Sequence, residues 1–187
     1  MELECKLAVD SHEPVREALR NAKATRVGRV LEVNRLFDRT DGSLRAAGCG
    51  LRIRRVTILD GEGPGGSVTF KGPVQKGAFK LREEIETPVA DLDAMERLLV
   101  ALGFKVHVAF EKRRETWRLG GCLVELDELP QIGEFVEIEG PDDASIQRVI
   151  EQLHLAGAIQ IRENYVTLVA RAGEADAEGC VTLYFDT

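Results

Sequence analysis

The sequence predicts an α+β protein in which a mainly antiparallel sheet or barrel has helices packed on its outside. Three observations support this fold class. Segments with a period of two outnumber the helical ones, turn residues separate many of them, and no long linker or internal repeat divides the chain. The 187 residues are the usual length of one domain, and 44% hydrophobic residues suffice for a sizeable core.

Three stretches have the spacing of amphipathic helices, with apolar residues recurring every three or four positions. Candidate caps and end signals place these helices from Ser11 to about Ala24, from Asp91 to before Gly103, and from Asp142 or Asp143 to before Gly157. Each stretch has one apolar side, so we expect these helices to pack against the outside of the sheet.

Segments with a period of two account for most of the remaining chain. They cover about 2–9, 26–37, 50–59, 66–72, 79–87, 104–117, 120–128 and 134–140, and residues 164–170 are a candidate for a further short strand. We take residues 1–170 as the domain and residues 171–187 as a C-terminal tail. The apolar run from Val181 to Phe185 is a candidate for a strand added to the sheet, and the sequence does not decide this.

Charge and cysteine content narrow the classes of function. The net charge of −7 and the pI of about 5.1 exclude a whole-protein basic field for nucleic acid. The first residues lack the pattern of a signal peptide, and no apolar run approaches the ~20 residues that span a bilayer. We therefore expect a soluble, cytoplasmic protein with no nucleic-acid or membrane partner. No CxxC pair or zinc spacing occurs, which predicts reduced, mostly buried thiols at Cys5, Cys49, Cys122 and Cys180.

Charged residues two apart recur in strand after strand, and side chains two apart on a strand point to the same face. The sets are Glu2, Glu4 and Lys6; Arg52 and Arg54; Lys71; Arg82, Glu84 and Glu86; Lys112 and Arg114; Glu125 and Asp127; Glu137 and Glu139. The positions between them are mostly apolar. A polar face turned to solvent is the ordinary interpretation of any one such strand.

Two properties of the whole set favour a functional interpretation. Several pairs carry a single sign although neighbouring like charges repel, and the pattern repeats across most strands. This sorting predicts charged faces that point inward around a polyvalent anion and its cations. Arginine and lysine suit phosphate oxygens, and carboxylates suit Mg²⁺ or Mn²⁺. We expect several of the carboxylates to be poorly matched until a metal binds.

The segment 104–117 departs from this rule. Val106, Val108 and Phe110 share the phase of the basic pair on the same strand, whereas the other phase is mostly charged or polar. The strand is therefore expected to have one apolar end on the inside of the sheet. For the segment 26–37, the sequence does not decide which side chains point to the inside of the sheet.

Six motifs, taken in order along the chain, resemble the CYTH family, the triphosphate tunnel metalloenzymes. They are ExExK at Glu2 to Lys6, LRIR at Leu51 to Arg54, TFKGP at Thr69 to Pro73, REEIE at Arg82 to Glu86, EKRR at Glu111 to Arg114 and VELDELPQIGEFVEIE at Val124 to Glu139. ExExK alone is a common pattern, but all six in this order are specific. The resemblance extends to about residue 169.

The resemblance implies an eight-stranded antiparallel β-barrel, or tunnel, that binds a triphosphate lengthwise, and it favours a homodimer. It implies that Mg²⁺ or Mn²⁺ is held by Glu2, Glu4, Glu125, Asp127, Glu137 and Glu139. It implies that phosphates are bound by Lys6, Arg52, Arg54, Lys71, Arg82, Lys112 and Arg114. We expect the catalytic residues to be Glu4, Lys6, Glu137 and Glu139.

The activities known in the family leave three functions open. The first is hydrolysis of inorganic triphosphate, thiamine triphosphate or a nucleoside triphosphate such as ATP. The second is a class IV adenylyl cyclase that makes cyclic AMP, and the third is a polyphosphate or nucleotide binder without catalysis. We favour hydrolysis because it needs only the tunnel, and the sequence shows no purine pocket. Leu36 stands where family members often have an aromatic residue, which disfavours a thiamine-triphosphate specialist.

Overall fold

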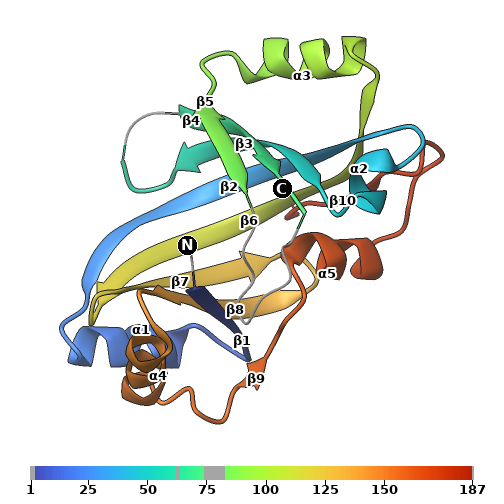
Figure 1. Cartoon of the computed structure of the whole chain (residues 1–187). Helices are drawn as coiled ribbons and strands as arrows, with labels where there is room; N and C mark the ends of the chain where they lie inside the picture. Colours follow the sequence, from blue (N-terminus) through green and yellow to red (C-terminus); the bar gives the residue numbers. More distant parts are fainter. Residues whose placement is uncertain (1–2, 62–63, 74–82, 187) are drawn as a thin grey trace.

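One curved, mainly antiparallel sheet forms the body of the protein, and a computed structural model describes residues 3–61, 64–73 and 83–186 (Figure 1). Its strands are β1 (Leu3–Val9), β2 (Thr25–Arg39), β3 (Gly50–Ile58), β4 (Pro64–Lys71), β5 (Glu84–Pro88), β6 (Phe104–Leu119), β7 (Cys122–Leu129), β8 (Gly133–Gly140), β9 (Ile159–Gln160) and β10 (Val181–Leu183). They pair in the order β5-β4-β3-β2-β6-β7-β8-β1-β9, and β10 pairs with β6 off this path.

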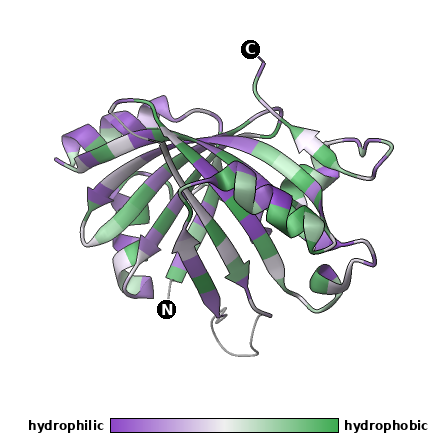
Figure 2. Ribbon diagram, turned by 90° about the horizontal axis from the view of Figure 1, so that it is seen from above, coloured by the Kyte–Doolittle hydropathy of each residue, from purple (hydrophilic) through white to green (hydrophobic). Residues whose placement is uncertain are grey.

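The predicted α+β fold with an antiparallel sheet is confirmed. The pairings along the main path are antiparallel, and the pairing of β10 with β6 is parallel. The strands curve round toward a tunnel, with bands of alternating hydropathy along them (Figure 2). Among the strands that the structure describes, the edge strands β5 and β9 do not pair with each other, so hydrogen bonds do not close the ring.

Helices α1 (Glu13–Asn21), α3 (Leu92–Ala101) and α4 (Asp143–Gln152) cover the outer face of the sheet, as the sequence predicts. The short helix α2 (Ser43–Ala46) lies between β2 and β3 in the chain, and α5 (Tyr165–Ala172) packs against the other face of β6. Leu19 of α1 and Val149 of α4 pack with Val124 and Val136 of the sheet, and none of these four side chains is more than 1% exposed. Burying such a side chain contributes roughly 1.5–3 kcal/mol, so this cluster anchors β7 and β8.

The outer helices begin at caps that are short polar residues, with one exception. The side chain of Asp91 accepts from the N–H of Ala94, and that of Asp142 accepts from the N–H of Ser145. Both caps agree with the sequence signals. The first helix differs, because its N-cap is His12 rather than Ser11 and it ends at Asn21 rather than near residue 24.

A fifth helix, α5, replaces the short strand predicted near 164–170. The side chain of Asn164 accepts from the N–H of Thr167 and so caps the helix. Tyr165, Leu168 and Val169 then fall on one side at helical spacing, and all three are buried. A short apolar run is ambiguous between strand and helix by periodicity alone, which explains the wrong prediction.

One end of β6 carries apolar side chains on the inside of the sheet, as the sequence predicts. The prediction is wrong for Val106. Val108 and Phe110 pack with Phe135 and with residues of α5 and β10. Val106 instead packs with Phe37 on the outer side of the sheet. The reason is a register shift in the pairing of β2 with β6 between Leu36 and Phe37, because an extra residue on one strand reverses the faces beyond it.

The cysteines are free thiols, as predicted, but most of them are not buried. Cys122 is buried, whereas Cys5, Cys49 and Cys180 are partly exposed. Within the described ranges, no helix is both long and apolar enough to cross a bilayer.

Candidate functional site

Charged side chains gather on the face of the sheet opposite α1, α3 and α4, which we call the inner face. On β1 and β8, Glu4 stands opposite Glu139 and Lys6 stands opposite Glu137. On the other side of β8, Glu125 of β7 stands opposite Glu137. Carboxylates that face one another directly repel, so this part of the inner face needs cations among its acids.

Arg114 of β6 is the central cation of this group. Its Nη1 lies 2.5 Å from Oε2 of Glu125, and its Nη2 lies 2.6 Å from Oδ2 of Asp127 and 2.6 Å from Oε2 of Glu137. Its Nε also donates to Oδ1 of Asp127 at 2.6 Å. The guanidinium therefore binds Asp127 through two parallel charge-assisted hydrogen bonds and joins three acids on two strands.

Lys112, two residues before Arg114, continues the network toward β2 and β3. Its Nζ lies 3.2 Å from Oδ2 of Asp127 and 3.3 Å from Oε2 of Glu32. Nη1 of Arg54 lies 3.1 Å from the other oxygen of Glu32. Glu32 and Lys112 are only 3% and 2% exposed, so their mutual attraction is little screened by water.

Lys6 connects the network to the segment that precedes α5. Its Nζ lies 3.3 Å from Oε1 of Glu137 and donates to the carbonyl oxygen of Glu163 at 3.0 Å. The ammonium also sits 3.8 Å from the centre of the Tyr165 ring, a cation–π contact. The Tyr165 hydroxyl donates to Oδ2 of Asp127 at 2.8 Å. Tyr165 therefore ties α5 to charged residues of β1 and β7.

The charged residues of β3, β4 and β5 form a second, more exposed group. Nη2 of Arg52 donates to Oγ1 of Thr69 at 3.2 Å and lies 3.5 Å from Oε2 of Glu86. The Thr69 hydroxyl donates to Oε2 of Glu86 at 2.6 Å. Nζ of Lys71 lies 2.7 Å from Oε1 of Glu84. Here each base pairs with an acid on β5. The side chain of Glu84 is 34% exposed and that of Glu86 is 53% exposed.

Burial and the local charges shift the pKa values of the acids around Arg114 in opposite directions. Burial raises the pKa of Glu125 to about 7, against the opposing charge of Arg114. Burial would also raise the pKa of Asp127, but Arg114 and Lys112 outweigh it and hold that pKa far below its ordinary value. The pKa of Glu137 is raised by burial and by the charge of Asp127. Asp127 thus stays ionised, while Glu125 changes charge near neutral pH.

The expectation of poorly matched carboxylates is wrong for the buried acids. Glu125, Asp127 and Glu137 each contact the guanidinium of Arg114. The physical reason is the strand order, which places β6 with its bases directly beside β7 with its acids. Glu4 differs, because it is exposed and forms no ion pair with another residue in the described part of the chain.

Carboxylate oxygens near the β1–β8 pair fit a hard divalent cation by their chemistry. Glu4 and Glu139 stand opposite each other, and Glu125 lies on the next strand, β7. Over residues 3–61, 64–73 and 83–186, no three acidic, histidine or cysteine side chains converge on a ready-made metal cage. A cation held here would complete its shell with phosphate oxygens and water, which is the usual manner for Mg²⁺.

The residues predicted for the site are brought to one face wherever the structure describes them. Glu2 and Arg82 lie outside the described residues. Two residues without a predicted role, Glu32 and Tyr165, belong to the same network. Glu32 lies on the segment whose phase the sequence leaves open, and Tyr165 lies where a strand was predicted. No local signal marks either one, because their partners come from distant strands.

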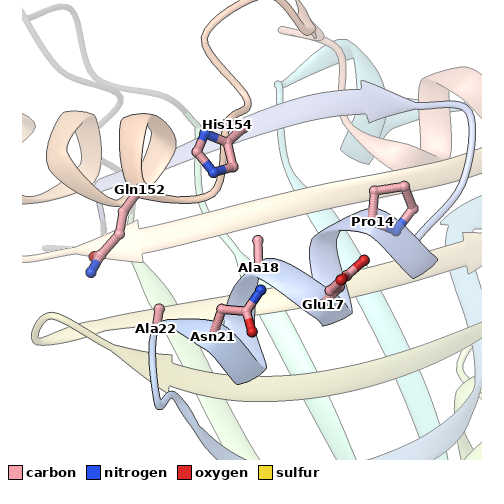
Figure 3. Close-up of a pocket in the computed structure, with 7 residues that line it drawn as sticks. All are labelled: Pro14, Glu17, Ala18, Asn21, Ala22, Gln152 and His154. Atoms are coloured by element: carbon pink, nitrogen blue, oxygen red, sulfur yellow. The ribbon is translucent and has the colours of Figure 1, made fainter.

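A groove between α1 and α4 lies on the outer side of the sheet, away from this network (Figure 3). Its volume is about 300 Å³, and its lining residues are Pro14, Glu17, Ala18, Asn21, Ala22, Gln152 and His154. The lining contains no lysine or arginine. It therefore lacks the charges that a phosphate would require, and the inner face is the better candidate site.

The fold and this face define a protein with an antiparallel sheet that carries interleaved acids and bases on its inner side. The model of the CYTH domain matches residues 1–166. The chain is 30% identical over 139 residues to "Putative adenylate cyclase MJ0240" of Methanocaldococcus jannaschii, an alignment that covers 74% of this chain and 76% of that protein. The chain belongs to the CYTH family.

Solved structures show the same fold. The PH1819 protein of Pyrococcus horikoshii matches with a TM-score of 0.75 at 24% identity, over 91% of this chain and 99% of that one. A protein of Hippeastrum, described as "Putative adenylyl cyclase HpAC1" with a dominant triphosphatase activity, matches with a TM-score of 0.68 at 19% identity, over 95% and 99% of the two chains. Family membership and the curated relative support an enzyme that binds a triphosphate compound.

Proposed function

We propose that this protein is a divalent-metal-dependent triphosphatase that binds its substrate along the inner face and hydrolyses a phosphoanhydride bond. The observation that carries the proposal is the convergence of bases from several strands on one face beside a set of carboxylates. The bases are Lys6, Arg52, Arg54, Lys71, Lys112 and Arg114. A linear polyanion is the kind of ligand that engages such a set.

The bases on β3 and β4 are the ones that a phosphate can engage with the least loss of existing contacts. Arg52 and Lys71 pair with the β5 acids Glu86 and Glu84, which are partly exposed to water. Ion pairs of this kind contribute little, so a phosphate with a higher charge can replace the carboxylates. Arg54 lies between this group and the buried network and extends the row of donors.

The metal would be held by Glu4, Glu125 and Glu139, with Glu2 as a further ligand from the start of the chain. When bound, it neutralises charge on the phosphate oxygens and can lower the pKa of a water molecule. Asp127 stays ionised and holds Arg114 and Lys112 in place on β6. These preorganised cations stabilise the charge that develops during phosphoryl transfer, which is usually the largest catalytic contribution.

The position of α5 supports water exclusion from one end of the inner face. The Tyr165 ring covers the ammonium of Lys6, and the apolar residues of α5 pack against Val108 and Phe110. In a site with few waters, each of these electrostatic contacts is stronger than it would be in bulk solvent. We therefore place the reacting phosphates on the charged part of the inner face and outside this apolar end.

A class IV adenylyl cyclase is the second candidate, and the name of the Methanocaldococcus jannaschii relative favours it. That reaction uses the same charged face but has the ribose 3′-hydroxyl as nucleophile and the α-phosphorus as target. It also needs a site for the adenine. We prefer hydrolysis because it requires no more than the charged face.

An assay of products distinguishes these functions. The protein is incubated with tripolyphosphate or ATP and with Mg²⁺ or Mn²⁺, and orthophosphate, cyclic AMP and pyrophosphate are measured. Hydrolysis releases orthophosphate, whereas cyclisation gives cyclic AMP with pyrophosphate. If neither set of products forms, the protein is a binder and the proposal fails.

The variants Glu4→Gln and Glu139→Gln test the role of the carboxylates. We expect turnover to fall at least about 100-fold in each, with the circular dichroism spectrum retained, because loss of a metal ligand removes charge stabilisation. Glu17→Gln is the matched control, since Glu17 is an exposed glutamate of α1 on the outer side. Near wild-type rates in both inner-face variants would refute the metal assignment.

A further inference from the structure

Asn34 lies in the middle of β2 and belongs to the inner face. It stands opposite Arg54 of β3 on one side and opposite Phe110 of β6 on the other. Its side chain is fully buried, with 0% exposure. Arg52 lies two residues before Arg54 on the same strand and therefore on the same face. A neutral polar residue thus occupies the floor of the face among the phosphate-binding candidates.

The hydrogen bond to Arg54 fixes which way the Asn34 amide points. Nε of Arg54 donates to Oδ1 of Asn34 at 3.0 Å. A guanidinium can only donate, so the atom it contacts must be the oxygen, and the NH₂ group must point away. That NH₂ group is buried and finds no acceptor among the described residues.

A second buried donor without a partner lies on β3, two residues from the position opposite Asn34. Nε of Arg52 also has no acceptor in the described part of the structure. Leaving a buried donor unsatisfied is costly, and native proteins rarely do so without a functional reason. Two such donors on neighbouring positions of one face indicate a missing acceptor, and an anion with several oxygen atoms can satisfy both.

We propose that Asn34 is a phosphate-binding residue whose NH₂ group donates to an oxygen of the bound triphosphate while its oxygen holds Arg54. This inference rests on the proposed function and assigns a further ligand-binding residue to the same site. A neutral donor suits this position, because a lysine there would repel the two arginines. An aspartate could hold Arg54 but would repel the anion.

Access to the buried NH₂ group requires the long side chain of Arg52 to turn with the anion, while Arg54 keeps its hydrogen bond to the Asn34 oxygen. Both are partly exposed, at 16% and 23% of the side-chain surface. Their present partners lie at 3.5 Å for Glu86 and 3.1 Å for Glu32, whereas a phosphate offers two oxygens to each guanidinium. Arg52 is therefore free to exchange the exposed Glu86 for the ligand, whereas Arg54 can bind the anion while it stays paired with the buried Glu32.

The test measures tripolyphosphate affinity by calorimetry in EDTA, so that no turnover interferes. Asn34→Leu has nearly the same shape and removes the unsatisfied donor, but it also removes the acceptor of Arg54 Nε, so we expect a small loss of thermal stability without ligand. We expect its affinity for tripolyphosphate to fall about tenfold, as for loss of a hydrogen bond to a charged group. Asn21→Leu, on the surface of α1, is the matched control and should bind as the wild type does.

A second pair of variants separates direct contact from an effect through Arg54. In an Arg54→Ala background, Asn34→Leu should still weaken binding by about tenfold if the amide touches the anion. If the substitution has no effect in that background, Asn34 only positions Arg54 and the inference is overturned. Asn34→Asp keeps the acceptor for Arg54 and should bind tripolyphosphate still more weakly than Asn34→Leu. It serves as the test if the leucine variant does not fold.

The outcomes also separate this inference from the proposed function. If the wild type binds tripolyphosphate and Asn34→Leu binds equally well, only the role of Asn34 is refuted. If the wild type itself fails to bind tripolyphosphate, with and without Mg²⁺, the proposed function is refuted and this inference with it.

Discussion

The inner face has two halves that use the same residue types in different surroundings. The buried half lies on β1, β6, β7 and β8, around Arg114, and the open half lies on β3, β4 and β5, around Arg52 and Lys71. Asp127 is 0% exposed in the buried half, whereas the Glu86 side chain is 53% exposed in the open half. Each half pairs acids with bases on adjacent strands, but only one of them is closed to water.

The difference shows that burial decides whether an ion pair is a scaffold or an exchangeable contact. In the buried half, Arg114 joins three acids and is held by several charge-assisted hydrogen bonds. Breaking such a set leaves uncompensated charge in a low dielectric. In the open half, burial and the neighbouring Arg54 lower the pKa of Arg52 to about 10, so an added negative charge there is favourable. A phosphate should therefore engage the open half first.

The largest expected effect comes from Arg114→Leu. The substitution leaves Glu125, Asp127 and Glu137 buried without their shared cation, so we expect the free energy of unfolding at pH 7.5 to fall by about 3–5 kcal/mol. Urea titration monitored by circular dichroism measures this value. Part of the loss should be recovered at pH 5.5, where the acids can take up protons.

The matched control is Arg55→Leu, on the same kind of strand but on the outer face. Arg55 pairs with Asp93, and these side chains are 47% and 71% exposed. An exposed pair contributes little, so we expect a change of about 0.5 kcal/mol or less. Equal losses in the two variants would contradict the distinction between scaffold and exchangeable contact.

A smaller effect is expected from the raised pKa of Glu125. Its pKa is about 7 in the folded protein and 4.5 as an ordinary glutamate. A raised pKa means that the folded state holds the proton more tightly, so this contribution is present below pH 4.5 and is lost as pH rises through 7. The full contribution is on the order of 3 kcal/mol.

The variant Glu125→Gln removes this titration. Between pH 5 and pH 8, we expect the wild type to lose on the order of 2–3 kcal/mol of unfolding free energy relative to Glu125→Gln. Urea unfolding at pH 5, 6.5 and 8 provides the comparison, and Glu151→Gln, an exposed glutamate of α4, is the control. A difference that stays constant with pH would show that Glu125 is not protonated in the folded protein.

The sequence predicted which residues share the inner face, because the period of two along a strand is a local property. Lys112 and Arg114, or Glu125 and Asp127, must point the same way once their strands form. The sequence could not predict which acid meets which base, since that depends on the order of strands that are distant in the chain. For this reason, Glu125 and Asp127, which we expected to lack a partner, both pair with Arg114.

The residues that sequence reasoning missed lie where local periodicity fails. Glu32 lies on β2, whose pairing with β6 shifts register at two places, so no single phase describes the strand. Tyr165 lies in a short apolar run that forms a helix through the cap at Asn164. These register shifts also explain why Val106 was assigned to the wrong face and why the face of Glu32 was not predicted. In each case a bulge or a cap, rather than hydrophobicity, determines the direction of the side chain.

Among the inner-face variants, the smallest expected effect on stability is that of Lys71→Met in the open half. Lys71 pairs with Glu84 at 2.7 Å, and the two side chains are 29% and 34% exposed. We expect the unfolding free energy to change by less than about 1 kcal/mol, because a partly exposed pair is well solvated. Tripolyphosphate affinity should nevertheless fall about tenfold, since a charge-assisted contact to phosphate is lost. Lys105→Met, at an exposed position of β6, should change neither property. If Lys71→Met instead unfolds the protein or leaves affinity intact, the open half is a scaffold too, and the ligand must engage the buried half first.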